Sequence, residues 1–520
     1  MTMIKSRTIG LILLIILGGF LLRIPYYFIY PTHVDDEGSH AAHAVAMMNG
    51  GLPYVDFAAD NKPPGIFYIY YVTFLLFGKY NMFAIHMMAF LCTLATAMVL
   101  GYCAYKISEK KASFLTAMVF YLTFTTTLLS ERVSANTEIF MALPYSLAVL
   151  LLWLAVTKEK GYLYFLSGVA CGLAPLIKQV GGIELVSVLF WLLLIPLFYG
   201  KKKWLLCLKT GALLCAGFIL PGLIVGLVFY RYGILSDALF WCFTYPKRYV
   251  SQGAQNIGFL TPFVEDFIPF FFTVTILWIL CGFWIKYAAS IRDNQKKTYQ
   301  FSIFLLLWLL ASIAATLIGS RMYPHYFIQI LPPLCLIAAL GVTRCYTGVT
   351  QSKQNYWKIA IVALTFLPGL VFTGIAISYG RENKIPDFLP ATEYIKAHTS
   401  PEDKIFVWGW ASGFYVYSER APATRFSFTT MLTGYKPGND PNERERSDIT
   451  WASAPEAWPM LEADLKRNEN ALIIDTSPGN RNNFGRYPIK DYPVLFDYVE
   501  QNCKMEATVV ETDIYRCKSK

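Results

Sequence analysis

The chain has 520 residues, of which 55% are hydrophobic and 15% are charged. A soluble globular domain carries about 25% charged residues, so this composition excludes a soluble multidomain protein. It equally excludes a disordered chain, a collagen and a coiled coil. The net charge of +10 arises in residues 1–379, which hold 27 Lys+Arg and 14 Asp+Glu, whereas residues 380–520 hold 18 and 21. No long basic tract is present, so we expect no nucleic-acid partner.

Apolar runs of roughly 20 residues, the length that crosses a bilayer as a helix, recur along the chain. They predict a polytopic α-helical membrane protein with about eleven transmembrane helices. The first run follows Lys5 and Arg7 as in a signal peptide, but it is too long and no small-residue cleavage site follows, so we expect an uncleaved anchor. The predicted spans are 9–29, 82–105, 112–130, 139–157, 162–177, 181–199, 205–229, 267–287, 300–318, 326–343 and 357–379.

Lysine and arginine are unevenly distributed over the loops between these runs, which predicts the orientation. If the N-terminus is cytoplasmic, the inside loops are rich in basic residues, for example at 106–111 and 201–203, and the outside loops are poor in them. An odd number of spans then places residues 380–520 outside the cytoplasm. We therefore expect a transmembrane domain over 1–379, with a first outside loop at 31–81, and an extracytoplasmic domain over 380–520.

The tail after residue 379 alternates helix-like and strand-like stretches. The helix-like stretches are 391–398, 456–468 and 492–502, and the strand-like runs are 404–408, 471–475 and 507–515. This alternation predicts a small α/β domain. Cys503 and Cys517 lie in this polar tail, whereas the other nine cysteines lie in or beside apolar runs. Because the tail is expected in an oxidising compartment, we predict a disulfide between the two.

Chemically active side chains gather in the first outside loop. Asp35, Asp36 and Glu37 are consecutive, His40 follows one helical turn later, and Lys62 precedes two prolines. Prolines stop a helix from including the lysine, so Lys62 is expected on a loop between two short interfacial helices. Three acids at a helix start are also suited to capping alone. Asp36 and His40 share a helical face, but two ligands are fewer than a metal site normally needs.

Further ionisable residues are predicted at the same outer edge. They are Glu131, Arg132 and Glu138 between the third and fourth spans, Lys178 and Gln179 after the fifth, Lys247 and Arg248 after the seventh, and Arg321 and His325 after the ninth. Charges at membrane depth are costly and by default indicate function, although a charge at the interface is cheaper. Together they would surround one face with acids and cations, as a site for a phosphorylated lipid and a hydroxyl nucleophile requires.

The order of these motifs resembles a known enzyme family. Asp36-Glu37, Gly51-Leu52-Pro53-Tyr54, Lys62-Pro63-Pro64, Lys178-Gln179 and the segment 321–326 follow one another as in GT-C glycosyltransferases of the bacterial protein-mannosyltransferase-like type, family 39, akin to the aminoarabinose transferases that act on lipid A. The resemblance covers essentially the whole chain. It implies a bacterial inner-membrane enzyme that moves a sugar from a polyprenyl-phosphate donor to a hydroxyl of a lipid, glycan or protein.

The resemblance also implies roles for individual residues. Asp36 maps to the acidic residue near the reaction centre, with Glu37 beside it, and both are predicted to be catalytic. Lys62 matches a residue that binds the donor phosphate, and Lys178 and Arg321 are predicted to assist it. A carboxylate can accept the proton of an incoming hydroxyl, and cations can stabilise the charge that develops on the departing phosphate.

A second acidic site is predicted at Glu138, with His325 as a possible contact for the acceptor. Some relatives carry an acid implicated in metal binding where this chain has Asn61, and here Glu138 replaces an aspartate. Whether a divalent cation takes part is therefore open, with Asp36 and Glu138 as the ligands if one does. No cofactor is required by the sequence.

Two other classes of protein fit the composition. A transporter or lipid flippase would also have many spans and buried charges, but transporters tend to show internal repeats and broken helices near the midplane, and no repeat is evident. A scaffold that only displays the tail would leave the acidic cluster and the Lys62-Pro63-Pro64 turn unexplained. The aromatic segment at 406–417 is expected either to form the core of the tail or to stack on sugar rings.

Overall fold

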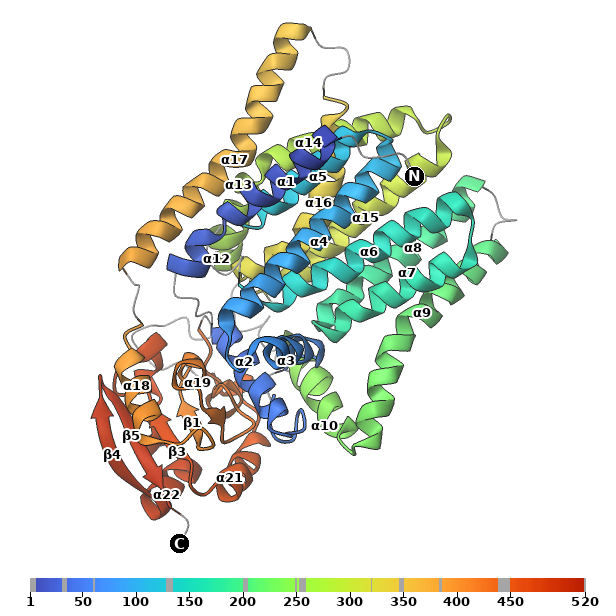
Figure 1. The fold of residues 1–520 in the computed structure, drawn as a ribbon. Coiled ribbons are helices and arrows are strands. Elements are labelled where there is room, and N and C mark those ends of the chain that lie inside the picture. Colours follow the sequence, from blue (N-terminus) through green and yellow to red (C-terminus); the bar gives the residue numbers. More distant parts are fainter. Residues whose placement is uncertain are drawn as a thin grey trace.

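The computed structural model describes residues 6–29, 35–58, 61–127, 134–199, 204–247, 250–251, 259–318, 320–345, 350–382, 386–437 and 449–518. Most of the chain forms a bundle of long helices, which lies above a smaller α/β unit in Figure 1. The bundle helices are α1 (Ser6–Leu21), α4 (Met82–Ser108), α5 (Lys111–Phe124), α6 (Thr137–Lys158), α7 (Gly161–Leu173), α8 (Ile183–Tyr199), α9 (Trp204–Arg231), α13 (Ile268–Thr273), α14 (Thr275–Ser290), α15 (Lys296–Leu317), α16 (Leu331–Val342) and α17 (Gln351–Glu382).

Seven helices of the described chain are long and apolar enough to cross a membrane, judged by length and composition, or eight if the bent pair Leu260–Thr273 and Thr275–Ser290 is one span. Three of the shorter apolar helices, Thr8–Leu21, Lys111–Phe124 and Gly161–Leu176, coincide with the remaining predicted spans. Ten of the eleven predicted spans thus overlap a single helix, whereas the span predicted at 267–287 is divided between two helices that meet at a 64° bend. The prediction of a polytopic α-helical membrane protein is confirmed, while the cytoplasmic location of the N-terminus stays a prediction.

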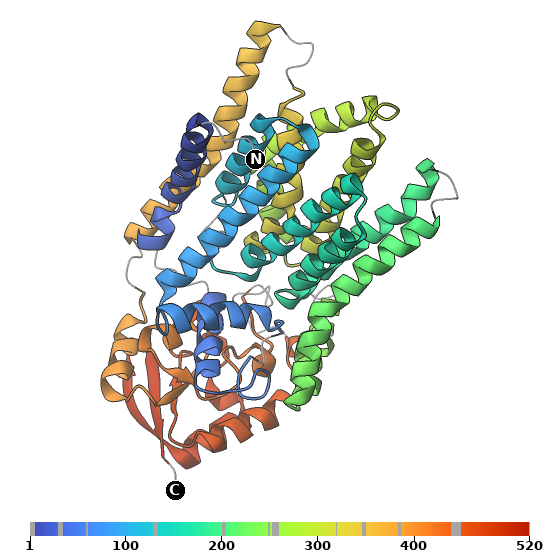
Figure 2. The same cartoon turned by 45° about the vertical axis from the view of Figure 1, so that its right-hand side comes forward.

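Two short helices, α2 (Asp35–Met48) and α3 (Gly65–Phe77), lie between the bundle and the α/β unit (Figures 1 and 2). The 13 residues of α3 rise only about 20 Å, which is less than the roughly 30 Å of a bilayer core. Pro64 is its N-cap residue, so the helix begins after the two prolines and leaves Lys62 on the preceding loop. Two short helices separated by this loop were expected from the sequence, and their presence is confirmed.

The C-terminal unit contains a five-stranded sheet in the order β2-β1-β3-β5-β4. Strands β2, β1 and β3 are parallel, and β5 and β4 continue the sheet in antiparallel pairing. The small α/β unit predicted from the sequence is thus present. Its elements are α18 (Leu389–His398), β1 (Lys404–Trp408), α19 (Gly413–Ser418), β2 (Ala421–Pro422), α20 (Thr430–Thr433), α21 (Ala457–Arg467), β3 (Leu472–Asp475), α22 (Pro493–Asn502), β4 (Cys503–Val509) and β5 (Thr512–Cys517).

The strand-like run predicted at 507–515 is divided between two strands, β4 and β5. The chain reverses at Val510 and Glu511, whose φ angles of 47° and 52° are left-handed. Tight hairpin turns of this kind usually carry Asn, Asp or Gly, and neither Val510 nor Glu511 is such a residue. The hairpin places Cys503 opposite Cys517, and the predicted disulfide between them is present.

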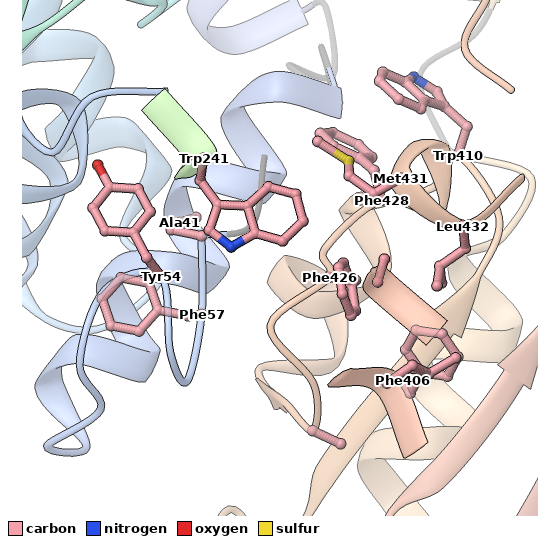
Figure 3. Packing of buried hydrophobic residues seen from close by; sticks show 14 of the residues in the cluster. Ala41, Tyr54, Phe57, Trp241, Phe406, Trp410, Phe426, Phe428, Met431 and Leu432 are labelled. Carbon is pink, nitrogen blue, oxygen red and sulfur yellow. The ribbon is translucent and has the colours of Figure 1, made fainter. Parts of the chain in front are cut away.

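The α/β unit packs tightly on the helical part of the chain. A Cβ added at Gly38 of α2 would lie 2.6 Å from the Ser412 hydroxyl oxygen, so only glycine permits this approach. The Tyr80 hydroxyl donates to the Arg420 carbonyl oxygen at 2.7 Å, and the Tyr245 hydroxyl donates to the Ala452 carbonyl oxygen at 2.7 Å. Large aromatic side chains from both parts belong to one buried cluster (Figure 3).

The aromatic segment at 406–417 was expected either to form the core of the α/β unit or to stack on sugar rings, and the burial of its side chains distinguishes the two. Phe406, Trp408, Phe414 and Tyr415 are fully buried, so they form the core and are not available to a ligand. Trp410 is 8% exposed and stacks on Phe428 with ring centroids 3.9 Å apart.

Candidate active site

The first site residues lie at the junction of the bundle and the α/β unit. Asp36 is in the first turn of α2, and its Oδ1 is 3.0 Å from the Lys62 Nζ, with each side chain 15% exposed. Asn136 donates from Nδ2 to the other carboxylate oxygen, Oδ2, at 3.2 Å. His40, one turn further along α2, has its Nε2 3.4 Å from the same Lys62 Nζ. The structure thus brings together the acid and the cation that the sequence placed on separate segments.

The electrostatic surroundings keep Asp36 charged. Burial by itself would raise the pKa of Asp36, but Lys62, followed by Lys436, His40 and His325, holds this pKa well below its usual value. Burial and the neighbouring Lys62 lower the pKa of His40 well below its usual value. At neutral pH Asp36 is therefore a carboxylate and His40 a neutral imidazole.

A second acid–cation pair lies at the start of α6. Glu138 is fully buried, and its Oε1 accepts a hydrogen bond from the Lys178 Nζ, while its Oε2 accepts one from Thr137 Oγ1 at 2.8 Å. The His325 Nε2 is 4.0 Å from Glu138 Oε1. The Lys178 ammonium also lies 3.8 Å from the centroid of the Tyr326 ring. Glu138 is therefore a neighbour of His325 and also of Lys178, which the sequence assigned to the donor phosphate.

Asn136 connects the two pairs. Its side-chain Oδ1 accepts from the Thr137 backbone N–H at 2.8 Å, which is the N-cap interaction that starts α6. The Nδ2 of the same amide donates to Asp36. One side chain thus fixes both the start of the helix that carries Glu138 and the orientation of the Asp36 carboxylate.

Glu37 faces a different environment from Asp36. Its side chain is 1% exposed, and its Oε1 accepts from the Ala135 backbone N–H at 2.5 Å and contacts the His86 Nε2 at 3.1 Å. Successive helical residues point about 100° apart, so Glu37 points away from Lys62. These contacts tie α2 to α4 and to the segment before α6. They favour a positioning role, and the catalytic role expected for Glu37 stays a prediction.

Uncharged side chains form hydrogen bonds to the backbone of the loop that carries Lys62. The Gln179 Nε2 donates to the Asn61 carbonyl oxygen at 2.7 Å and to the Cys242 carbonyl oxygen at 2.9 Å. The Tyr54 hydroxyl donates to the Lys62 carbonyl oxygen at 2.9 Å. The Gln179 and Tyr54 side chains therefore hold the loop backbone at Asn61 and Lys62, from which the Lys62 side chain projects.

Arg321 lies in the segment that follows α15. Its side chain is largely buried, at 8% exposed, and its Cζ is 6.0 Å from the centroid of the Trp451 ring. Both neighbours are non-glycine residues with left-handed backbones, with φ of 59° for Ser320 and 44° for Met322. Such backbone conformations are costly and cluster at functional sites, which supports a role for this segment.

Lys436, from the α/β unit, is a site residue that the sequence analysis missed. Its Nζ is 4.8 Å from the Tyr323 ring centroid and 5.6 Å from that of Trp410. The Tyr323 hydroxyl donates to the Pro437 carbonyl oxygen at 2.8 Å, which anchors the lysine's neighbour. Lys436 also contributes to lowering the pKa of Asp36. It is 400 positions away in the sequence, so no spacing pattern could have revealed it.

Some predicted site residues cannot be placed. Glu131, Arg132 and Arg248 lie outside the described residues, as does the side chain of Asp35. Within the described part of the chain, no three His, Cys, Asp or Glu side chains come together as metal ligands. Asp36 and Glu138, the two candidate ligands, each face a lysine ammonium, which a divalent cation would have to displace. This donor set does not fit a divalent metal ion.

Comparison with known proteins gives three kinds of match. The family described as dolichyl-phosphate-mannose-protein mannosyltransferase matches residues 61–224. An undecaprenyl phosphate-alpha-4-amino-4-deoxy-L-arabinose arabinosyl transferase from Enterobacter sp. (strain 638) is 23% identical over 391 residues, which are 72% of this chain and 67% of that protein. A second such transferase, from Wigglesworthia glossinidia brevipalpis, is 23% identical over 66% of this chain and 60% of its own length.

Solved structures share the fold across nearly the whole chain. ArnT from Cupriavidus metallidurans, bound to undecaprenyl phosphate, superposes with a TM-score of 0.62 at 13% identity and covers 97% of this chain and 98% of its own. The oligosaccharyltransferase AglB from Archaeoglobus fulgidus, in complex with an inhibitory peptide and a dolichol-phosphate, gives a TM-score of 0.53 at 12% identity and covers 99% of this chain and 74% of its own. The chain therefore has the fold of the GT-C glycosyltransferases and resembles the aminoarabinose transferases among them.

Proposed function

We propose that this membrane glycosyltransferase moves a sugar from a polyprenyl-phosphate donor to a hydroxyl of a lipid, glycan or protein acceptor. The observation that carries the proposal is the Asp36–Lys62 pair, a charged carboxylate beside a fixed ammonium at 3.0 Å in a site that remains 15% exposed. The named relatives are undecaprenyl-phosphate arabinosyl transferases, and a structural neighbour binds undecaprenyl phosphate. Both support a donor of this class.

In the proposed reaction, Asp36 is the general base. The acceptor oxygen forms a bond to the anomeric carbon of the donor, and the bond from that carbon to the phosphate oxygen breaks. The phosphate leaves with the bonding electron pair, and the hydroxyl proton moves to Asp36. Lys62, with Arg321 and Lys436, is proposed to stabilise the charge on the departing phosphate, more strongly in a partly dehydrated site than in water.

The shared ammonium of Lys62 couples donor binding to the strength of the base. A carboxylate that is held by Lys62, with a lowered pKa, is a weak proton acceptor. When a donor phosphate competes for the same ammonium, Asp36 loses part of that stabilisation and its pKa rises. The base would thus become effective when the leaving group is in place.

The second pair is proposed to serve the acceptor side and the donor phosphate. Glu138 is fully buried and its two carboxylate oxygens have partners, so it is proposed to position Lys178 and His325. Lys178 remains 18% exposed and can reach a bound phosphate. His325 stacks against Tyr323 with ring centroids 5.8 Å apart, beside the α/β unit, where an acceptor would enter.

The protein is a multi-pass inner-membrane protein, as its ArnT-like relatives and apolar helices indicate. We propose that the N-terminus is cytoplasmic and that the site and residues 380–520 face the opposite side, with 1–379 as the transmembrane catalytic domain. The distribution of basic residues between the loops supports this orientation. The tight contact of α2 with the α/β unit supports a tail that completes the catalytic face.

Mass spectrometry of a strain that lacks the protein tests this function. One envelope glycan, lipid or protein should lose a sugar residue, and the matching polyprenyl-phosphate sugar should accumulate. Wild-type protein and Glu419→Gln, whose carboxylate pairs with Lys396 on the surface of the α/β unit, should restore the decoration, whereas Asp36→Asn should not. Unchanged pools of both sugar forms, or full restoration by Asp36→Asn, would contradict the proposal. If the protein were instead a flippase, Asp36→Asn would still restore the decoration in cells. Detergent extracts of the strain that lacks the protein would then still carry out the sugar transfer.

A further inference from the structure

A separate cavity of about 450 Å³ lies at the end of the bundle away from Asp36. Helix α6 begins next to Asn136 and ends at Lys158, so its 22 residues separate the two ends by roughly 33 Å. Helices α7, α8 and α9, which enclose much of the cavity, lie side by side in both views (Figures 1 and 2). The cavity takes no part in the proposed reaction.

The chemistry of this cavity is amphipathic. Lys209 of α9 and Lys297 of α15 are exposed lining residues, as is Glu159 at the end of α6. The Lys297 Nζ is 2.7 Å from Glu159 Oε1, so the three side chains together carry a formal charge of +1. The remaining walls are mainly apolar or aromatic and include Tyr164, Trp191, Ile195 and Leu213.

Gln300 adds a buried polar group to the lining. It is 4% exposed, and its backbone carbonyl oxygen accepts from the Trp191 Nε1 at 2.8 Å. Its side chain lines the cavity, and a side-chain amide can both donate to and accept from the polar head of a ligand.

The cavity borders a lipid-facing surface. Leu205, Leu206 and Leu208 at the start of α9 are 77%, 50% and 64% exposed, and Trp204 beside them is 42% exposed. Apolar residues with a tryptophan at the helix end are typical of the membrane interface. Basic pockets between transmembrane helices bind anionic lipid head groups.

We propose that this cavity binds an anionic glycerophospholipid, with its phosphodiester between Lys209 and Lys297, its glycerol head near Gln300 and its acyl chains along the exposed leucines of α9. The volume is in the range of small-molecule sites. The formal charge of +1 complements a singly charged phosphodiester. A phosphomonoester with up to two charges, such as polyprenyl phosphate, would meet Glu159 as an uncompensated repulsive charge, so the cavity is a lipid site distinct from the donor site.

Native mass spectrometry of the purified full-length protein tests this, with phosphatidylglycerol, phosphatidylethanolamine and undecaprenyl phosphate as probes. Wild-type protein should retain phosphatidylglycerol about fivefold more strongly than phosphatidylethanolamine, because the cavity carries one net positive charge and one such charge near a lipid surface contributes about 1 kcal/mol, or roughly fivefold. The double variant Lys209→Gln/Lys297→Gln should lose this preference. The control Lys396→Gln, an exposed lysine of the α/β unit, should keep it.

A third variant keeps the test decisive if the double variant fails to fold. Among the described residues that line the cavity, Glu159 carries the only acidic side chain, so Glu159→Gln should strengthen the retention of phosphatidylglycerol and add a second undecaprenyl phosphate per protein. Equal retention of phosphatidylglycerol and phosphatidylethanolamine by the wild-type protein would overturn the proposal. So would an unchanged preference in the double variant, or no gain of either lipid in Glu159→Gln.

Discussion

Lys62→Met removes the cation of the central pair while keeping a long side chain. At 3.0 Å, an attraction between unit charges is about 5 kcal/mol with an effective dielectric constant of about 20. Breaking a buried pair costs about 3–5 kcal/mol because it leaves an uncompensated charge. Since Asn136 still donates to the Asp36 carboxylate and the site is partly exposed, we expect the lower end, about 3 kcal/mol of stability.

The variant should also alter the pH dependence of transfer. The lowered pKa of Asp36 keeps the base charged until the pH falls through that low value. Without Lys62, burial raises the pKa, so the acid limb of the pH–rate profile should move to higher pH. Affinity for sugar-free polyprenyl phosphate should fall about tenfold to hundredfold, the range for one charge-assisted hydrogen bond.

A double-mutant cycle separates these effects from general damage. Asp36→Asn/Lys62→Met removes both charges, so it should recover most of the stability lost in Lys62→Met, as expected for directly coupled residues. Lys396→Met is the matched control, because this lysine forms an exposed pair with Glu419. Additive stability changes, together with unchanged lipid affinity and an unmoved acid limb in Lys62→Met, would refute the role given to Lys62.

Three further predictions concern the α/β unit. Non-reducing peptide mapping should recover Cys503 linked to Cys517, and serine at both positions should cost about 3 kcal/mol, the value for a loop of about 15 residues; two free thiols would contradict this. Burial is the main cause that raises the pKa of Asp475 to about 6. The contribution of Asp475 to folding stability is therefore present below pH 4 and is lost as the pH rises through 6. Asp475→Asn should therefore stabilise the unit by at most about 3 kcal/mol at pH 8 and not at pH 4. Chemical denaturation that shows an equal gain in stability at pH 8 and pH 4 would contradict the raised pKa. A C-terminal alkaline phosphatase fusion should be active and a C-terminal GFP fusion dark; the reverse would overturn the orientation.

The helices were predictable because hydropathy acts locally. Ten predicted spans overlap a single helix, the span at 267–287 is divided between α13 and α14, and the prolines at 63 and 64 correctly marked the start of α3. The strands at 404–408 and 471–475 were equally evident from short apolar runs. The hairpin at Val510 and Glu511 was not, because neither residue type favours the left-handed conformation that the turn adopts.

The site was predictable only in part, and mainly through its resemblance to a family. Asp36 and Lys62 were expected near each other from their motifs, but the different directions of Asp36 and Glu37 depend on how α2 packs against α4. Lys436 comes from a distant loop of the α/β unit, and its proximity results from tertiary packing alone. The two hydrogen bonds of Asn136 likewise depend on tertiary packing, because α2 and the start of α6 must be adjacent before this side chain can reach both partners.

The most direct test of the central claim is a sugar-transfer assay in proteoliposomes. Labelled polyprenyl-phosphate sugar and an envelope extract as acceptor are supplied to wild-type protein and to Asp36→Asn, and donor binding is measured on the same preparations. If Asp36 is the general base, the wild-type protein should transfer the sugar, Asp36→Asn should lose at least a thousandfold in turnover, about 4 kcal/mol in the barrier, and both should retain donor binding. Near wild-type turnover by Asp36→Asn, or no transfer by wild-type protein that binds the donor, would contradict that claim.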